Sequence, residues 1–212
     1  MLKHVMRRGA IKPYCGYSLT ELLVACGLAS IVISAVATQA ARSHIAYSSI
    51  QHATSVEDDI RALQSTITQH LSKAGFVYSP NTLSPFGATT IENTVFEITT
   101  GHRANEPENS CVTFSYDKNK DGVVSQAQGE FFGYRLHDNA IEYRVAGHSC
   151  IQSGWYDLTD TQTTVATKFM VNRRHSSSWG SAYEIEIELH SKVDPTVKSA
   201  RTFIVEAVNA YY

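Results

Sequence analysis

A short run in the middle of the chain has the residue types and spacing of a calcium-binding loop. Starting at Asp117 it reads Asp-Lys-Asn-Lys-Asp-Gly, with oxygen-bearing side chains at alternate positions before a glycine. In such loops these side chains converge on one ion, and the glycine permits a sharp turn. Ser125 stands at the ninth position, but Gln128 replaces the usual bidentate glutamate at the twelfth. The run therefore predicts calcium, with a metal-free Asn/Asp/Gly-rich turn as the alternative. The candidate ligands are Asp117, Asn119, Asp121 and Ser125.

A single acid, Glu21, stands at the start of a long apolar run. From Leu22 to Ala41 no residue carries a formal charge, and Arg42 ends the run. Twenty residues in a helix rise about 30 Å, which is enough to cross the hydrocarbon core of a bilayer. A carboxylate beside lipid is costly unless it is paired, so Glu21 is a functional candidate. The alternative is a hydrated carboxylate at the level of the lipid headgroups.

The sequence contains none of the common enzymatic motifs. It has no G-x-S-x-G nucleophile elbow, no H-E-x-x-H zinc motif and no glycine-rich phosphate loop, and its nine histidines are scattered. His148 lies two residues before Cys150, but a cysteine nucleophile there would be lost if Cys150 formed a disulfide. We therefore expect no enzymatic activity, and no cofactor other than the calcium considered above.

Few residues could contact nucleic acid. Arg173 and Arg174 lie close in sequence to Trp179 and Tyr183, and such a set can bind phosphates and stack on bases. After residue 16, however, the chain has 14 basic and 20 acidic residues, a net charge of −6. Nucleic-acid-binding surfaces are usually basic, so the charge argues against this partner without excluding it.

The composition divides the 212 residues into four segments. Residues 1–16 form a basic leader, 17–41 an apolar transmembrane helix, 42–75 an amphipathic helix, and 76–212 a loop followed by a globular sheet domain. The leader holds four Lys or Arg and no acid. The positive-inside rule therefore places the N-terminus in the cytoplasm and the bulk of the chain in the periplasm or outside.

The amphipathic segment has one apolar face with steps of three and four residues. Gly75 is expected to cap its C-terminus, with Lys73 in the last turn. No proline lies between Tyr14 and Ser79, so one continuous helix of about 55 residues is predicted. The apolar face consists of Val56, Ile60, Leu63, Ile67, Leu71 and Ala74.

The hydrophobic period changes to two after a loop at residues 76–93. From Tyr183 to Leu189 the odd positions are apolar and the even positions acidic, which is typical of a strand with one wet face. Turn-forming residues at 137–139 and 176–180 predict antiparallel hairpins. Because no strand–helix–strand alternation appears, the predicted class is α+β with an antiparallel sheet. The expected strands are 94–99, 111–116, 131–136, 140–146, 165–172, 182–190 and 199–208.

The N-terminal motif resembles the type III signal sequence of type IV prepilins and type II secretion pseudopilins. The family pattern is a basic leader, Gly, an aromatic residue, Ser or Thr, Leu, any residue and Glu, followed by an apolar helix. Here the run is Gly-Tyr-Ser-Leu-Thr-Glu, with Tyr17 in place of the usual Phe. The resemblance implies cleavage between Gly16 and Tyr17, N-methylation of Tyr17, and pairing of Glu21 with the N-terminal amine of a neighbouring subunit. The alternatives are an uncleaved anchor and a secretory signal cut after residues 35–37.

The second half resembles the PilW-type minor pilins and their prepilin-peptidase-dependent relatives. This resemblance implies a pilin-like fold, in which a long N-terminal helix packs on an antiparallel sheet, with a disulfide in the C-terminal part. Cys15 would leave with the leader and Cys26 lies in the apolar helix, so Cys111 and Cys150 are expected to bond in an oxidising compartment. The blocks that carry the resemblance are Lys73-Ala74-Gly75-Phe76, Cys111-Val112-Thr113-Phe114, Phe132-Gly133-Tyr134-Arg135, Ile141-Glu142-Tyr143-Arg144 and Trp155-Tyr156-Asp157-Leu158.

Together these features predict a minor type IV pilin, and the family resemblance implies that it helps to initiate pilus assembly and sits near the pilus tip. Its expected partners are prepilin peptidase/N-methyltransferase, other minor and major pilins, and a tip adhesin. It would reside in the inner membrane and then in the extracellular pilus. Three alternatives stay open: a minor pseudopilin of a type II secretion system, a tip subunit that binds DNA or a surface, and a membrane-anchored periplasmic enzyme.

Overall fold

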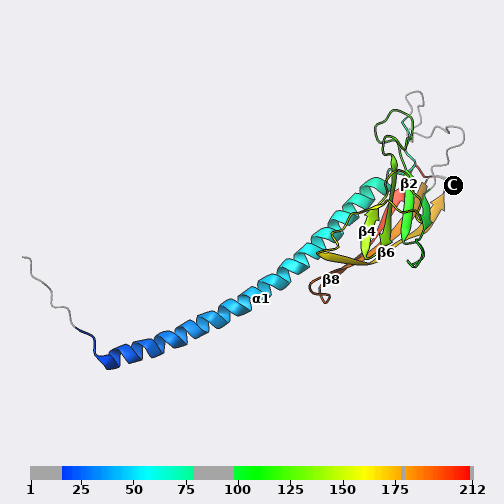
Figure 1. Ribbon diagram of the computed structural model, residues 1–212. Coiled ribbons are helices and arrows are strands. Elements are labelled where there is room, and N and C mark those ends of the chain that lie inside the picture. The colour runs from blue at the N-terminus through cyan, green and yellow to red at the C-terminus, as the bar shows by residue number, and fades with distance from the viewer. Residues whose placement is uncertain (1–15, 79–97, 178–179, 211–212) are drawn as a thin grey trace, which may run out of the picture. The chain divides into compact units, whose positions relative to one another are not determined.

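The computed structural model describes residues 16–78, 98–177 and 180–210 (Figure 1). The leader up to residue 15, most of the predicted loop and residues 94–97 of the first predicted strand lie outside the described residues, as does Trp179. Across the described residues the class is α+β as predicted, with one long helix and two antiparallel sheets. The chain separates into two units, Met1–Ser48 and Ser49–Tyr212.

Helix α1 (Leu19–Leu71) ends four residues before the predicted cap. A tighter turn follows, in which the backbone N–H of Ala74 donates to the carbonyl of Leu71 at 3.1 Å. Gly75 has a positive φ of 79°, but its N–H donates to the carbonyl of Ser115 at 2.9 Å. Gly75 therefore links the chain to the sheet, and the prediction that it caps the helix with Lys73 in the last turn was wrong.

The apolar face predicted for the amphipathic segment, residues 42–75, is confirmed. Its six residues are only 0–3% exposed and join a hydrophobic core with side chains from both sheets. Polar contacts flank this core. His70 Nδ1 lies 2.5 Å from the hydroxyl of Tyr134, and the hydroxyl of Thr164 donates to the carboxylate of Asp59 at 2.5 Å. Burial of the apolar face and these contacts fix this part of the helix on the sheets.

The first sheet contains five antiparallel strands in sequence order (Figure 1). The turn between its third and fourth strands is formed by Asp138 and Asn139, whose φ angles of 47° and 64° suit a type I′ hairpin turn. The strand predicted at 140–146 stops at Tyr143, because Ala146 and Gly147 also have positive φ and begin a turn. The strands are β1 (Thr99–Gly101), β2 (Cys111–Ser115), β3 (Phe131–His137), β4 (Ala140–Tyr143) and β5 (Tyr156–Asp157).

The second sheet has the order β6-β7-β8, and all pairs are antiparallel. In its central strand the apolar residues Tyr183, Ile185, Ile187 and Leu189 are 0–1% exposed, whereas the glutamates between them are partly exposed. The predicted alternation is therefore confirmed. The strands are β6 (Thr164–Ser177), β7 (Gly180–Ser191) and β8 (Lys198–Ala207).

The two sheets meet along β6. The backbone N–H of Ala166 donates to the carbonyl of Asn139 at 2.7 Å, and that of Val171 donates to the carbonyl of Asn109 at 2.8 Å. These contacts join β6 to the β3–β4 turn and to the β1–β2 loop. Helix α1 and the inner faces of both sheets thus share one core.

Candidate functional site

The predicted processing motif lies at the start of α1. Gly16 and Tyr17 precede the helix, and the side chain of Tyr17 is 90% exposed. A β-carbon built on Gly16 would meet no atom within 4 Å. Within the described residues, the peptide bond between Gly16 and Tyr17 is therefore sterically open.

Ser18 and Glu21 form a capping box at the helix start. The backbone N–H of Ser18 donates to Glu21 Oε2 at 2.9 Å, and the backbone N–H of Thr20 donates to Ser18 Oγ at 3.2 Å. These bonds satisfy two amide groups that a helix N-terminus otherwise leaves unpaired. The S-x-x-E spacing that signals a capping box was present in the sequence but did not enter our prediction, which considered Glu21 as a partner for another subunit or as a hydrated carboxylate at the level of the lipid headgroups.

The first unit presents apolar side chains all around the helix. Large apolar residues between Leu19 and Val36 are at least 60% exposed. They include consecutive positions, and neighbouring residues on a helix point about 100° apart, so the apolar surface is not confined to one face. By length and composition α1 can cross a membrane. A helix that is apolar on every side needs lipid or other protein around it.

Three hydroxyl side chains in the apolar part of this unit donate hydrogen bonds to carbonyls of the helix itself. Ser30 donates to the carbonyl of Gly27, Ser34 to that of Ser30, and Thr38 to that of Ala35, each at 2.8 Å. A hydroxyl that is hydrogen-bonded in this way is less costly to place in an apolar environment. Before Arg42, Glu21 is the one formally charged residue of the described helix.

The predicted disulfide is confirmed. Cys111 and Cys150 are bonded with an S–S distance of 2.11 Å, and Cys26 is a free, exposed cysteine. The bond ties β2 to the loop after β4. Because 39 residues separate the two cysteines, the bond should stabilise the fold by about 3–4 kcal/mol in the chain-entropy model.

The buried guanidinium of Arg135 supports this disulfide loop. Its Nε lies 2.5 Å from Glu142 Oε2, and Nη1 donates to the carbonyls of Cys150 (2.8 Å) and Gln152 (2.7 Å). The guanidinium carbon also lies 4.5 Å from the ring centre of Trp155. The carboxylate of Glu142, two backbone carbonyls and the ring of Trp155 thus surround the Arg135 side chain, which is 1% exposed. These contacts compensate for the cost of burying its charge.

In the predicted calcium loop, Asp117 is buried and its carboxylate accepts hydrogen bonds from backbone amides. The amides of Lys120 (2.6 Å) and Asp121 (3.3 Å) donate to Oδ1, and those of Gly122 (2.9 Å) and Tyr78 (3.0 Å) donate to Oδ2. Four N–H groups therefore occupy the carboxylate that would be the first calcium ligand. A cation at Asp117 would have to displace some of these donors.

The other candidate ligands also make local hydrogen bonds. Asn119 and Gln128 both donate to Asp121 Oδ2 at 2.9 Å. The buried carboxylate of Glu130 accepts from the backbone amides of Lys118 (2.8 Å), Asn119 (3.3 Å) and Ser125 (2.8 Å). Two buried acids, Asp117 and Glu130, thus hold the loop through its backbone, and sequence reasoning had missed the role of Glu130.

Of the two aromatic residues considered for nucleic-acid binding, only Tyr183 lies within the described residues, and it is not available for stacking. Tyr183 is only 1% exposed and faces the core, so its assignment as a stacking residue was wrong. Arg174 is engaged with Glu184 at 2.5 Å. The alternation along β7 explains the burial, because Tyr183 shares the inner face with Ile185.

Two comparisons with known proteins match most of the chain and carry the same family description. A sequence model of the family described as "Prepilin peptidase-dependent protein B" matches residues 49–207. A protein of Escherichia coli (strain K12) with that same description is 22% identical over 197 residues, which cover 92% of this chain and 96% of the relative. No solved structure matches the chain.

Proposed function

Because this chain belongs to the prepilin peptidase-dependent protein B family, we propose that it is a minor type IV pilin. In this proposal it is a structural subunit without catalytic activity, which helps to start pilus assembly and sits near the pilus tip. The family description itself supports dependence on a prepilin peptidase and a pilin-like character. The finer role rests on the arguments that follow.

The observation that carries the proposal is the combination of an open Gly16–Tyr17 bond with an apolar helix directly behind it. Cleavage there would leave a chain that starts within a few residues of α1 and is apolar on every side of its first turns. Such a helix is suited to reside in the inner membrane before assembly and to pack among other helices afterwards. Methylation would fall on the new amine of Tyr17.

In this proposal the carboxylate of Glu21 pairs with the N-terminal amine of a neighbouring subunit. In an apolar bundle, a carboxylate and an amine that are each costly alone stabilise one another. Ser18 uses Oε2 of Glu21, and a carboxylate has further acceptor sites on both oxygens. Glu21 can therefore cap its own helix and accept the amine of a neighbouring mature chain.

The proposed partners are the peptidase/N-methyltransferase, other minor and major pilins, and a tip adhesin. A minor pseudopilin of a type II secretion system is the second candidate, because the same processed helix serves that assembly. The net charge of −6 after residue 16 gives a DNA-binding tip subunit less support.

The two assemblies can be separated by deleting the gene in the source bacterium. We expect fewer surface pili, with secretion of folded enzymes unchanged, and we expect the wild-type chain in sheared pilus fractions. Loss of secretion with normal pili would instead identify a pseudopilin. If neither piliation nor secretion changed, the proposed function would be contradicted.

A further inference from the structure

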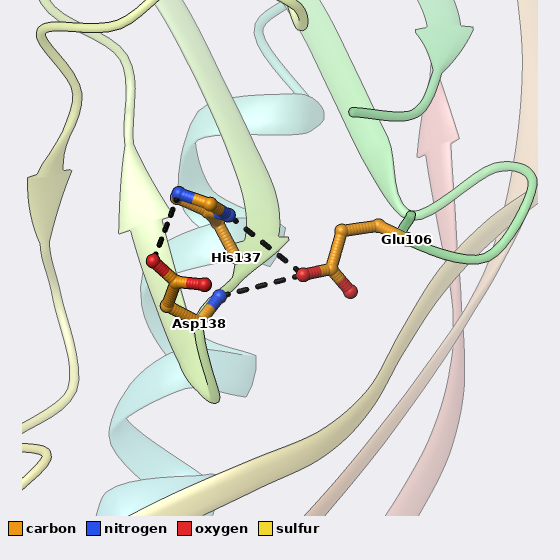
Figure 2. Close-up of side chains that lie close together, drawn as sticks. All are labelled: Glu106, His137 and Asp138. Carbon is orange, nitrogen blue, oxygen red and sulfur yellow. Dashed lines mark hydrogen bonds and ion pairs between the residues drawn. The ribbon is translucent and has the colours of Figure 1, made fainter. Parts of the chain in front are cut away.

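Three side chains of types that bind metal ions, one of them distant in sequence from the other two, meet at one end of the first sheet. Glu106 lies in the loop between β1 and β2, His137 is the last residue of β3, and Asp138 begins the β3–β4 turn. One ligand atom from each lies within 4.8 Å of the other two. Figure 2 shows the imidazole between the two carboxylates, with one ring nitrogen toward each acid.

Nδ1 of His137, the ring nitrogen on the side of Glu106, has no hydrogen-bond partner. Nδ1 is fully buried as an atom, and its nearest acid oxygen, Glu106 Oε1, is 3.7 Å away, too far for a hydrogen bond. A buried polar atom without a partner calls for an explanation, and an ion is one of the ordinary ones. On the outer side of the ring, Nε2 lies 3.2 Å from Asp138 Oδ2.

The local backbone positions Glu106. The side chains of Glu106 and His137 are about one fifth exposed. The amide of Asp138 donates to Glu106 Oε1 at 3.4 Å, and the amide of Glu106 donates to the carbonyl of Arg103 at 3.0 Å. The side chain of Asp138 is 87% exposed, so little packing opposes its rotation.

We propose that Glu106, His137 and Asp138 form a binding site for a divalent transition-metal ion such as Zn²⁺. A neutral imidazole with two carboxylates offers one nitrogen and two anionic oxygens, a donor set that zinc accepts. Around one tetrahedral zinc ion, ligand atoms lie about 3.3 Å apart, close to the separation of Nδ1 and Glu106 Oε1. Rotation of the Asp138 side chain toward Nδ1 completes the three ligands, and water takes the fourth position.

The ion would cross-link two segments that are far apart in sequence. It joins the β1–β2 loop, which leads into the disulfide-bonded Cys111, to the turn that contacts β6. This inference uses only residues of the second unit and does not depend on the proposed pilin role. Binding of the ion would add to the stability that the disulfide gives the second unit.

Titration of the full chain with Zn²⁺ alone tests the site. The protein should be kept in detergent micelles without a polyhistidine tag, with Cys15 and Cys26 replaced by serine because free thiols bind zinc. We expect saturable binding of one ion per chain and a rise in melting temperature. His137→Asn should weaken binding at least about tenfold, since loss of even outer-shell partners weakens metal sites by about 10–100-fold. Asp138→Asn preserves a residue type that tolerates positive φ and should also weaken binding.

The matched control is His102→Asn, which removes an exposed histidine from the same β1–β2 loop. This variant should bind as the parent chain does. A parent chain that shows neither binding heat nor a change in melting temperature would overturn the proposal. So would a His137→Asn variant that is folded, by its own melting transition, and binds zinc with unchanged affinity.

Discussion

Glu21 accepts a hydrogen bond from the backbone N–H of Ser18 at 2.9 Å, so the lone acid of the apolar helix closes the first turn of that same helix. The charge that we propose for assembly is therefore held in position before any neighbour arrives. Its second oxygen is not used by Ser18. The residue thus combines a local role in capping with the proposed role between subunits, and the two roles can be separated by mutation.

Replacing Glu21 by Gln should keep the cap and remove the charge, because Gln also serves at this position of a capping box. We expect Glu21→Gln to be processed like wild type, as judged by gel mobility, and to be depleted from sheared pili. Glu21→Val removes the cap as well and should be depleted at least as much. Incorporation of Glu21→Gln at the wild-type level would refute the proposed pairing.

Removing Glu142 should strongly destabilise the second unit. Glu142→Ala leaves the buried guanidinium of Arg135 without its carboxylate, at a cost of about 3–5 kcal/mol. Denaturant unfolding of the full chain in micelles, followed by tryptophan fluorescence, measures this loss. Glu184→Ala is the matched control, because its partner Arg174 is 60% exposed, and it should cost less than about 1 kcal/mol. Equal losses in the two variants would contradict our account of Arg135.

The contact between Glu57 and strand β8 should depend on pH. Hydrogen bonds from Ser199 and Arg61, and then from Arg201, lower the pKa of Glu57 from 4.5 to about 2. A carboxyl whose pKa is lower in the folded state stabilises the fold above its unfolded pKa and loses that effect as pH falls. The melting-temperature advantage of wild type over Glu57→Gln should therefore be full above pH 4.5 and shrink toward pH 2. An advantage independent of pH would contradict this contact, and the exposed Asp58→Asn serves as control.

Asp117 should stabilise its loop in the absence of metal. In Asp117→Asn an NH₂ group replaces one of the two oxygens that accept backbone amides, so a cost of about 1–3 kcal/mol is expected in EDTA. Asp160→Asn is the control, since Asp160 is exposed and accepts from the backbone of Gln162, and it should change stability by less than about 0.5 kcal/mol. If EDTA alone unfolded the wild-type loop, as seen by hydrogen exchange, calcium would be its organising element.

Much of the fold could be predicted because its hydrophobic patterns are regular. The spacing from Val56 to Ala74 predicted the buried face of α1, and the alternation from Tyr183 to Leu189 predicted the inner face of β7. The same alternation placed Tyr183 in the core, which its interpretation as a stacking residue overlooked. Strand β5 is only two residues long, too short to produce a periodic signal.

Features that depend on distant residues were not visible in the sequence. The way the two sheets are joined depends on contacts of β6 with Asn109 and Asn139. The meeting of Glu106 with His137 depends on how two loops fold together. The hydrogen bond of the Gly75 amide likewise depends on tertiary structure, because its acceptor is a carbonyl of β2. Local patterns predict elements and their faces, whereas the pairing of loops is decided by tertiary structure.

The central claim is that the chain is processed at the start of its apolar helix. Mass spectrometry of the protein purified from the membranes of the source bacterium tests it, by reading the N-terminal peptide. Our account predicts a chain that begins at Tyr17 with a methylated amine. A chain that still begins at Met1, or one that begins beyond residue 37, would contradict it.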